Sequence, residues 1–132
     1  MTNKIKLIIF DLDGVLVEAK NIHYDSLNQA LGKKYEITWE EHLSLYDGLK
    51  TNQKLEMLSE KKGLDPKNHN SIWLEKQRIT LKKLSTLKSD EKLRSIMSKL
   101  VSDGYKISVC SNSIRKTILT VLSKLGRRGR LF

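Results

Sequence analysis

Hydrophobic residues open the chain as one short apolar run, and the spacing then changes to that of amphipathic helices. The run Ile5–Phe10 stops at Asp11, which predicts a buried β-strand over residues 5–10. From Glu18 onward apolar positions recur at helical spacing, so we expect a helix over residues 18–31 that Gly32 ends. The candidate buried positions of this helix are Ile22, Leu27, Ala30 and Leu31.

Cap signals divide the next segment into three further helices. They are of three kinds: a capping-box pair, a threonine before a helical pattern, and an aspartate before a proline. In chain order they stand at Thr38 with Glu41, at Thr51, and at Asp65 with Pro66. The helices that they begin should end near Tyr46, Gly63 and Leu84. We therefore expect helices alone over residues 18–87.

The last third of the chain returns to a strand between two helices. Ser89 is a candidate cap for an amphipathic helix that ends before Gly104, and residues 105–110 predict a second strand. A further helical pattern runs through Leu125. A helix that leads directly into a strand favours a parallel pair, whose strands end at the same edge of the sheet. Asp11 and Ser111 should therefore be neighbours.

This element order predicts an α/β core over residues 1–17 and 88–132, with a helical insertion over residues 18–87. The 132 residues, 39% of them hydrophobic, suffice for a small core with an appended subdomain. The first apolar segment is too short to span a bilayer, and it lacks the order of basic, apolar and small residues that marks a secretory signal. We therefore expect a cytoplasmic protein without a membrane partner. The single cysteine, Cys110, lies in an apolar stretch, which predicts a buried, unreactive thiol.

The formal net charge of +10 indicates an anionic partner, either a phosphorylated small molecule or nucleic acid. Most lysines are scattered beside acidic residues in helical patterns, which is typical of a solvated surface. The exception is the cluster Arg127, Arg128 and Arg130, but no tryptophan lies near it in the sequence to form a stacking platform. We therefore expect a small phosphorylated metabolite, and we do not expect nucleic acid.

Candidate chemistry lies where the first strand ends. Residues two apart on an extended chain project to the same side, so Asp11 and Asp13 can share one small volume, and Gly14 lets the chain turn beyond them. Such a pair can divide the roles of nucleophile and proton carrier and invites Mg²⁺. A solvated turn is the simpler alternative. A calcium-binding loop is excluded, because its first and twelfth positions would be Ile9 and Lys20.

Ser111 ends the second strand with a hydroxyl, and the helix that follows presents free N–H groups toward the same edge. This is a candidate phosphate-binding site. The alternative is that Ser111 and Ser113 only cap that helix. Combined with Asp11 and Asp13, a nucleophile, a second acid and an anion-binding helix start favour phosphoryl transfer through an aspartyl-phosphate.

Two segments together resemble a known family. The segment Leu7–Leu16, with Asp11-Leu12-Asp13-Gly14, and the segment Val109–Ser113 are similar to the first two motifs of the haloacid dehalogenase-like hydrolases. The helical insertion between them resembles the subgroup that includes phosphoglycolate phosphatase and beta-phosphoglucomutase. The resemblance, over about residues 4–126, implies a parallel Rossmann-like α/β core of the haloacid dehalogenase type, truncated here, with an inserted α-helical cap.

The resemblance also implies roles for individual residues and a Mg²⁺ cofactor. Asp11 would be the nucleophile and a Mg²⁺ ligand. Asp13 would protonate the leaving oxygen, activate water and offer its backbone carbonyl to the metal. Ser111 would bind the transferring phosphoryl group, and Asn112 would order its loop.

Three residues of the insertion are candidate substrate contacts by the same resemblance. His23 matches a position where sugar-phosphate mutases of this group carry a histidine, and the alternative is a surface residue of a helix. Gly48 and Lys50 lie in a segment similar to the cap loop that contacts the leaving group, and the alternative is an ordinary turn between helices. Asp47 and Thr51 stand where that loop usually offers basic residues, which weighs against a mutase.

The chain also departs from the family pattern. A later lysine and a later acidic motif are expected, yet no Asp or Glu follows Asp103, and Lys116 and Lys124 come too soon after Ser111 to take the lysine role. Only two strands are predicted, so we expect an N-terminal portion of a longer hydrolase, with a partner or a second copy covering the open sheet edge. The predicted function is a Mg²⁺-dependent phosphatase acting on a small phosphate monoester. The alternatives are a phosphosugar mutase and a noncatalytic remnant that binds phosphate or a partner.

Overall fold

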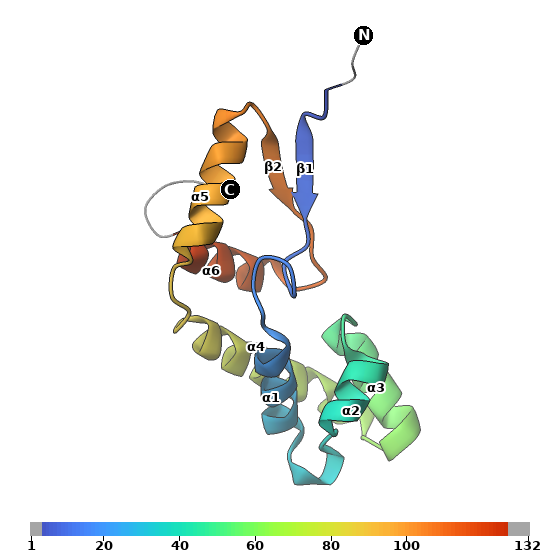
Figure 1. Cartoon of the computed structure of the whole chain (residues 1–132). Helices are drawn as coiled ribbons and strands as arrows, with labels where there is room; N and C mark the ends of the chain where they lie inside the picture. Colours follow the sequence, from blue (N-terminus) through green and yellow to red (C-terminus); the bar gives the residue numbers. More distant parts are fainter. Residues whose placement is uncertain (1–3, 127–132) are drawn as a thin grey trace. The chain divides into compact units, whose positions relative to one another are not determined.

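The computed structural model describes residues 4–126, so the arginine cluster Arg127, Arg128 and Arg130 lies outside the described part. The chain divides into two compact units (Figure 1). One, called here the α/β unit, combines Met1–Glu18 with Leu84–Phe132. The other, the helical unit, is Ala19–Lys83. Each unit is described by itself below.

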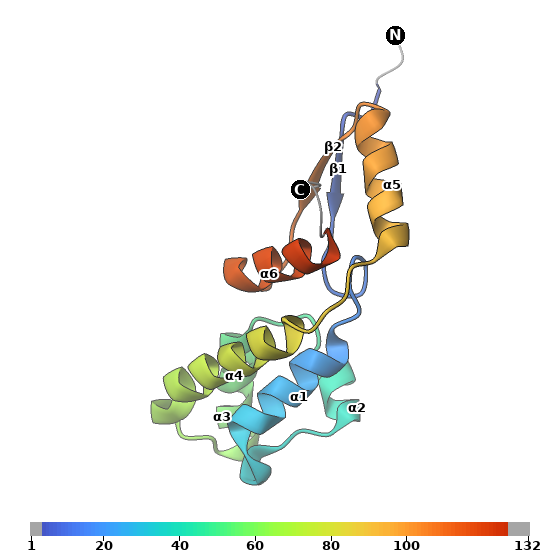
Figure 2. The ribbon, with the colours of Figure 1, turned by 90° about the vertical axis from the view of Figure 1, so that its left-hand side faces the viewer.

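The α/β unit contains a parallel pair of strands, β1 (Leu7–Phe10) and β2 (Lys106–Val109). Helix α5 (Glu91–Ser102) leads into β2 and lies beside the strands, and α6 (Arg115–Leu125) follows β2 (Figure 2). The order strand, helix, strand, helix and the parallel pairing confirm the sequence prediction for this unit. The strands are shorter than predicted, because the ladder begins at the pair Leu7 and Lys106 and ends at the pair Phe10 and Val109.

The two faces of this small sheet differ in burial. Ile8, Phe10, Ile107 and Val109 are half-buried, whereas Leu7 and Ile9 on the opposite face are 50% and 60% exposed. The prediction of a buried first strand is therefore wrong for one face. A strand becomes buried on both faces only where other elements cover both, and no second layer covers Leu7 and Ile9 within residues 4–126.

Cys110 is exposed, so the prediction of a buried thiol is also wrong. Its side chain continues the alternation of β2, in which Lys106 and Ser108 are exposed while Ile107 and Val109 are half-buried. An apolar neighbourhood in the sequence did not reveal on which side of the strand the thiol lies. No helix within residues 4–126 combines the length and the apolar character that crossing a membrane requires.

The helical unit contains only helices, as the sequence predicts. These are α1 (Lys20–Leu31), α2 (Trp39–Glu41), which continues into a π-helical turn (His42–Tyr46), α3 (Thr51–Lys62) and α4 (His69–Leu84), with 3-10 turns at Lys33–Tyr35 and Pro66–Asn68. They enclose one hydrophobic core. Its buried members are Leu27, Leu31, Ile37, Tyr46, Leu55, Leu58, Leu64 and Ile72.

The caps are partly as predicted. Thr38 and Glu41 form the expected capping box: Thr38 Oγ1 accepts from Glu41 N–H at 3.1 Å, and Glu41 Oε2 accepts from Thr38 N–H at 2.7 Å. Ser89 is not the cap of α5, because Asp90 Oδ1 accepts from Leu93 N–H at 2.9 Å. Thr51 is not a cap either, since it is the first residue of α3. Both errors are shifts of one residue.

Candidate active site

The pairing of β1 with β2 brings the two candidate loops to one edge of the sheet. Phe10 and Val109 are register partners, and Cys110 N–H extends the ladder by donating to the Phe10 carbonyl at 2.9 Å. Neighbouring strands lie about 5 Å apart, so the backbones of Asp11 and Cys110 leave the sheet side by side. Both arrows in Figure 1 end at this edge. The predicted proximity of Asp11 and Ser111 is thereby confirmed.

A hydrogen bond joins the two loops directly. Ser113 Oγ donates to Asp13 Oδ2 at 3.2 Å, across 100 positions of sequence. Both residues are half-buried, so water competes with the bond less than it would at an open surface. Sequence reasoning missed Ser113 as a site residue, although its position two residues after Ser111 was a usable signal.

The loop after β1 holds the two carboxylates in different surroundings. Asp11 is exposed, and its Oδ1 accepts from Leu12 N–H at 2.7 Å. Leu12 is fully buried, which confirms that it turns back into the protein between the two acids. A tight turn follows, in which Gly14 N–H donates to the Val17 carbonyl at 2.7 Å. Gly14 has φ +79°, a conformation that glycine adopts without strain.

The loop after β2 is organised by its two serines. Ser111 Oγ accepts from Ser113 N–H at 3.1 Å, and Asn112 between them is exposed. Helix α6 begins only at Arg115, and its N-cap residue, Ile114, makes no side-chain cap hydrogen bond. The Ser111 and Ser113 hydroxyls therefore make hydrogen bonds to Ser113 N–H and to Asp13 rather than to the N-terminus of α6. This argues against helix capping as their function.

The donor atoms at this edge suit a hard cation. Carboxylate oxygens of Asp11 and Asp13 are the ligand type that Mg²⁺ prefers, and Mg²⁺ is commonly held by one or two carboxylates together with substrate phosphate and water. Within residues 4–126, no group of three or more His, Cys, Asp or Glu residues is placed to hold a metal ion. The oxygen donors of Asp11 and Asp13 therefore fit Mg²⁺ in chemical type.

The candidate substrate contacts His23, Gly48 and Lys50 all lie in the helical unit. His23 is half-buried on α1, and Gly48 has φ +76° in the turn between the π-helical turn and α3. Lys50 is exposed and precedes α3, where its backbone N–H donates to Gln53 Oε1 at 3.1 Å. The roles predicted for these three residues stay predictions.

The turn that contains Gly48 also carries charge of both signs. Asp47 Oδ2 lies 3.5 Å from Lys20 Nζ, and Asp47 Oδ1 lies 3.9 Å from His42 Nε2. His42 is fully buried and stacks on Trp39, with 5.3 Å between ring centroids. Burial lowers the pKa of His42, and Lys54, His23 and Lys20 lower it further, while Asp47 raises it.

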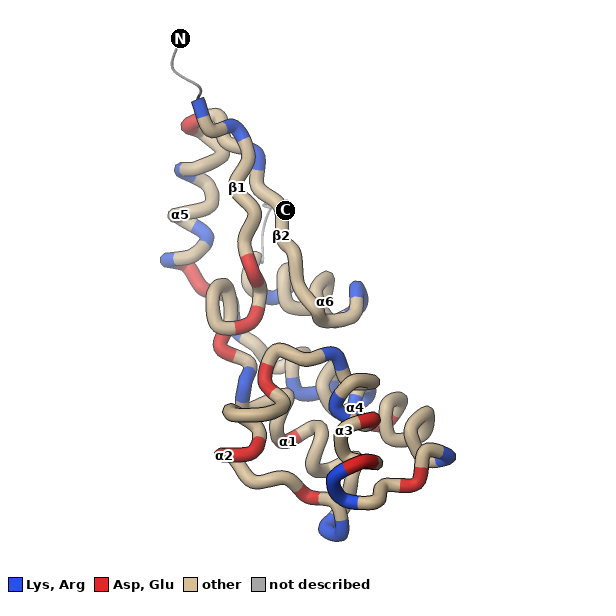
Figure 3. The backbone as a smooth tube through the Cα atoms, turned by 90° about the vertical axis from the view of Figure 1, so that its right-hand side faces the viewer, with Lys and Arg blue, Asp and Glu red and all other residues tan. Residues whose placement is uncertain are grey.

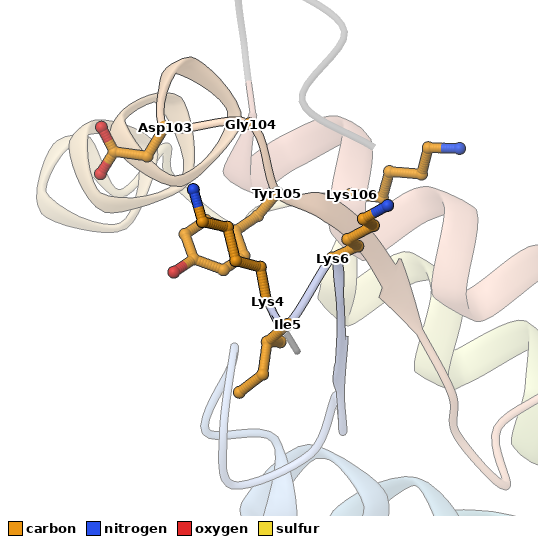
Figure 4. A pocket seen from close by; sticks show the side chains of 7 residues that line it. All are labelled: Lys4, Ile5, Lys6, Asp103, Gly104, Tyr105 and Lys106. Carbon is orange, nitrogen blue, oxygen red and sulfur yellow. The ribbon is translucent and has the colours of Figure 1, made fainter. Parts of the chain in front are cut away.

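A surface hollow occurs at the other end of the strands, away from the two carboxylates (Figure 4). Its volume is about 690 Å³. The lining residues are Lys4, Ile5, Lys6, Asp103, Gly104, Tyr105 and Lys106. Its lysines are exposed, and Asp103 pairs with Lys99 at 3.1 Å, which is typical of a solvated surface. We do not place the active site there, because this end of the sheet lacks the paired carboxylates and hydroxyls.

The distribution of charge is in keeping with this choice. Figure 3 shows acidic stretches directly after β1, and both acidic and basic residues are also spread over the two units. The acidic residues after β1 lie at the strand end, where a metal ion and a phosphate group can offset their charge.

A parallel sheet that presents paired acids and hydroxyls at its carboxyl edge defines an α/β protein with its candidate site at the strand ends. The family model described as haloacid dehalogenase-like hydrolase matches residues 8–131. The chain therefore belongs to this family, which makes it a hydrolase of the haloacid dehalogenase superfamily. The search of curated proteins finds no match.

Proposed function

We propose that this chain is a Mg²⁺-dependent phosphatase that hydrolyses a small phosphate monoester through an aspartyl-phosphate. The observation that carries the proposal is the hydrogen bond from Ser113 to Asp13, because it joins the acid loop after β1 to the hydroxyl loop after β2. Nucleophile, proton carrier and phosphate-binding hydroxyl can then act on one phosphorus atom.

In the first step, a carboxylate oxygen of Asp11 attacks phosphorus and the bond from phosphorus to the leaving oxygen breaks. The leaving oxygen keeps the electron pair and takes a proton from Asp13, so an alcohol departs. In the second step, Asp13 takes a proton from water as the water oxygen attacks phosphorus, and the bond from phosphorus to the Asp11 oxygen breaks. Inorganic phosphate is released, and Asp11 returns as a carboxylate.

Ser111 and Asn112 have supporting roles in this proposal. The Ser111 hydroxyl donates to an oxygen of the transferring phosphoryl group, and Asn112 orders the loop between the two serines. The Asp11 carboxylate and the Asp13 backbone carbonyl would hold Mg²⁺, which would supply positive charge to offset that of the phosphoryl oxygens. The helical unit would serve as the cap, with His23, Gly48 and Lys50 as substrate contacts, and the cytoplasm is the proposed compartment.

A noncatalytic function is the second candidate. It is favoured by the finding that, within residues 4–126, no group of three or more His, Cys, Asp or Glu residues is placed to hold a metal ion. In that case the loops after β1 and β2 would bind phosphate or a partner without turning over a substrate.

The two candidates differ in covalent chemistry, so the test follows the aspartyl-phosphate. The full chain is assayed with Mg²⁺ for phosphate release from p-nitrophenyl phosphate and small sugar phosphates, and beryllium fluoride is used to trap the acyl-phosphate state. Asp11→Asn is compared with Lys106→Gln, a control at the opposite end of the strands. We expect turnover and trapping in the wild type and in Lys106→Gln, and neither in Asp11→Asn. Phosphate binding without turnover or trapping would establish the noncatalytic function.

A further inference from the structure

Ser113 contacts both halves of the candidate site. Its hydroxyl donates to Asp13 Oδ2 at 3.2 Å, and its backbone N–H donates to Ser111 Oγ at 3.1 Å. Ser113 thus connects the proposed proton carrier with the proposed phosphate-binding hydroxyl.

The usual structural role of a serine at this place does not account for the geometry. A serine just before a helix commonly accepts a hydrogen bond from an N–H of the first turn. Here α6 begins at Arg115 after Ile114, without a side-chain cap, and the Ser113 hydroxyl is directed to the carboxylate instead.

We infer that Ser113 is a positioning residue, which fixes the Asp13 carboxyl group where it must deliver its proton. The inference rests on the proposed function. A carboxyl group with one oxygen bound to a neighbouring loop rotates less about its side-chain bonds, so the proton is held in line with the leaving oxygen. As the bond to phosphorus breaks, the leaving oxygen keeps the electron pair and accepts this proton, and Asp13 becomes a carboxylate.

Two substrates separate this role from a general structural one. The leaving group of p-nitrophenyl phosphate departs as a stable anion and needs no proton, whereas an alkyl leaving group such as that of glycerol phosphate does. Loss of proton delivery should therefore slow the first step, formation of the aspartyl-phosphate in a single turnover, for the alkyl ester and spare it for the aryl ester. The second step is common to both esters and involves Asp13 as well, so the comparison is made on the first step alone. A weakened fold or a weakened phosphate site would reduce both alike.

The full chain and the variants Ser113→Ala, Ser113→Thr and Ser98→Ala are assayed with both esters. We expect Ser113→Ala to lower the single-turnover rate of glycerol release from glycerol phosphate about tenfold with substrate affinity unchanged, a part of the roughly 10²- to 10⁴-fold that general acid catalysis contributes. Its single-turnover rate of p-nitrophenol release should change less than about twofold, because this leaving group needs no proton. Ser113→Thr, which keeps the hydroxyl, should restore proton delivery, and Ser98→Ala on the exposed face of α5 should behave as wild type.

The outcomes distinguish the two claims. A wild type that turns over neither ester overturns the proposed function, and this role with it. If the wild type is active, and Ser113→Ala shows equal losses of the first-step rate for both esters or no loss, only the positioning role is overturned. Should Ser113→Ala fail to fold by circular dichroism, Ser113→Cys replaces it, because the thiol is a weak donor of similar size.

Discussion

Ser113 Oγ lies 3.2 Å from Asp13 Oδ2, although 100 residues separate the two in the chain. The proximity follows from the parallel register of β1 and β2, which places Phe10 opposite Val109 and lets both loops leave the sheet at the same level. Single substitutions on these loops can therefore be tested both for their effect on stability and for their effect on the proposed reaction.

The conformation of the acid loop depends on Gly14. Gly14 has φ +79°, and a Cβ atom added there would meet nothing within 4 Å, so any cost of a side chain is conformational. Gly14→Ala should lower the free energy of unfolding of the α/β unit by about 1 kcal/mol. Gly14→Asn should cost less, because asparagine tolerates positive φ better. Denaturant unfolding of both variants measures the difference, and equal costs would contradict this explanation.

Two neighbouring residues, Ser89 and Asp90, can be compared as the N-cap of helix α5. Asp90 Oδ1 accepts from Leu93 N–H, while the neighbouring Ser89 is exposed and is not the N-cap. Asp90→Ala should lower the free energy of unfolding of the α/β unit by about 1 kcal/mol, and Ser89→Ala should change it by only a few tenths. Thermal and urea unfolding of the two variants decide between them. A larger loss in Ser89→Ala would reinstate the cap that the sequence predicts.

Ser89 and Asp90 also show how far sequence patterns reach. Periodicity predicted the helices and both strands, because apolar spacing reports the elements directly, and the strand order then placed Asp11 beside Ser111. The predicted cap of α5 was wrong by one residue, since Ser and Asp are both good caps and only backbone geometry selects one.

Burial and loop contacts were harder to predict. Leu7 and Ile9 were expected to be buried, but burial depends on what covers a strand, and an apolar run does not specify that. The bond from Ser113 to Asp13 depends on the conformations of two loops, which no periodicity encodes.

The core of the helical unit can be tested with a matched pair of leucines. Leu55 on α3 is fully buried in the hydrophobic core, whereas Leu74 on α4 is 55% exposed. Leu55→Ala should lower the free energy of unfolding of this unit by about 2–5 kcal/mol, because it removes buried methyl groups and leaves a cavity. Leu74→Ala should cost well under about 1 kcal/mol. Amide hydrogen exchange resolves the helical unit from the α/β unit, and similar losses for the two leucines would contradict the core as described.

His42 should make the stability of the helical unit depend on pH. Its ring is fully buried against Trp39 and Tyr24, and the charged groups that influence it are Lys20 and His23 on α1, Lys54 on α3 and Asp47 in the following turn. Burial is the main cause that lowers the pKa of His42 below its ordinary value of 6.5. The unfolded chain therefore binds a proton more readily than the folded one.

The sign of the effect follows from this difference in proton binding. The stabilisation is fully present above pH 6.5, and it is lost as the pH falls from there through the lowered pKa of the folded state. His42→Phe keeps a stacked ring but cannot be protonated. The unfolding free energy of this variant should therefore fall less than that of the wild type as the pH is lowered from 6.5 through the pKa of folded His42. Hydrogen exchange of α1 and α3 at several pH values measures both proteins, and parallel pH profiles for wild type and His42→Phe would show that another group carries the dependence.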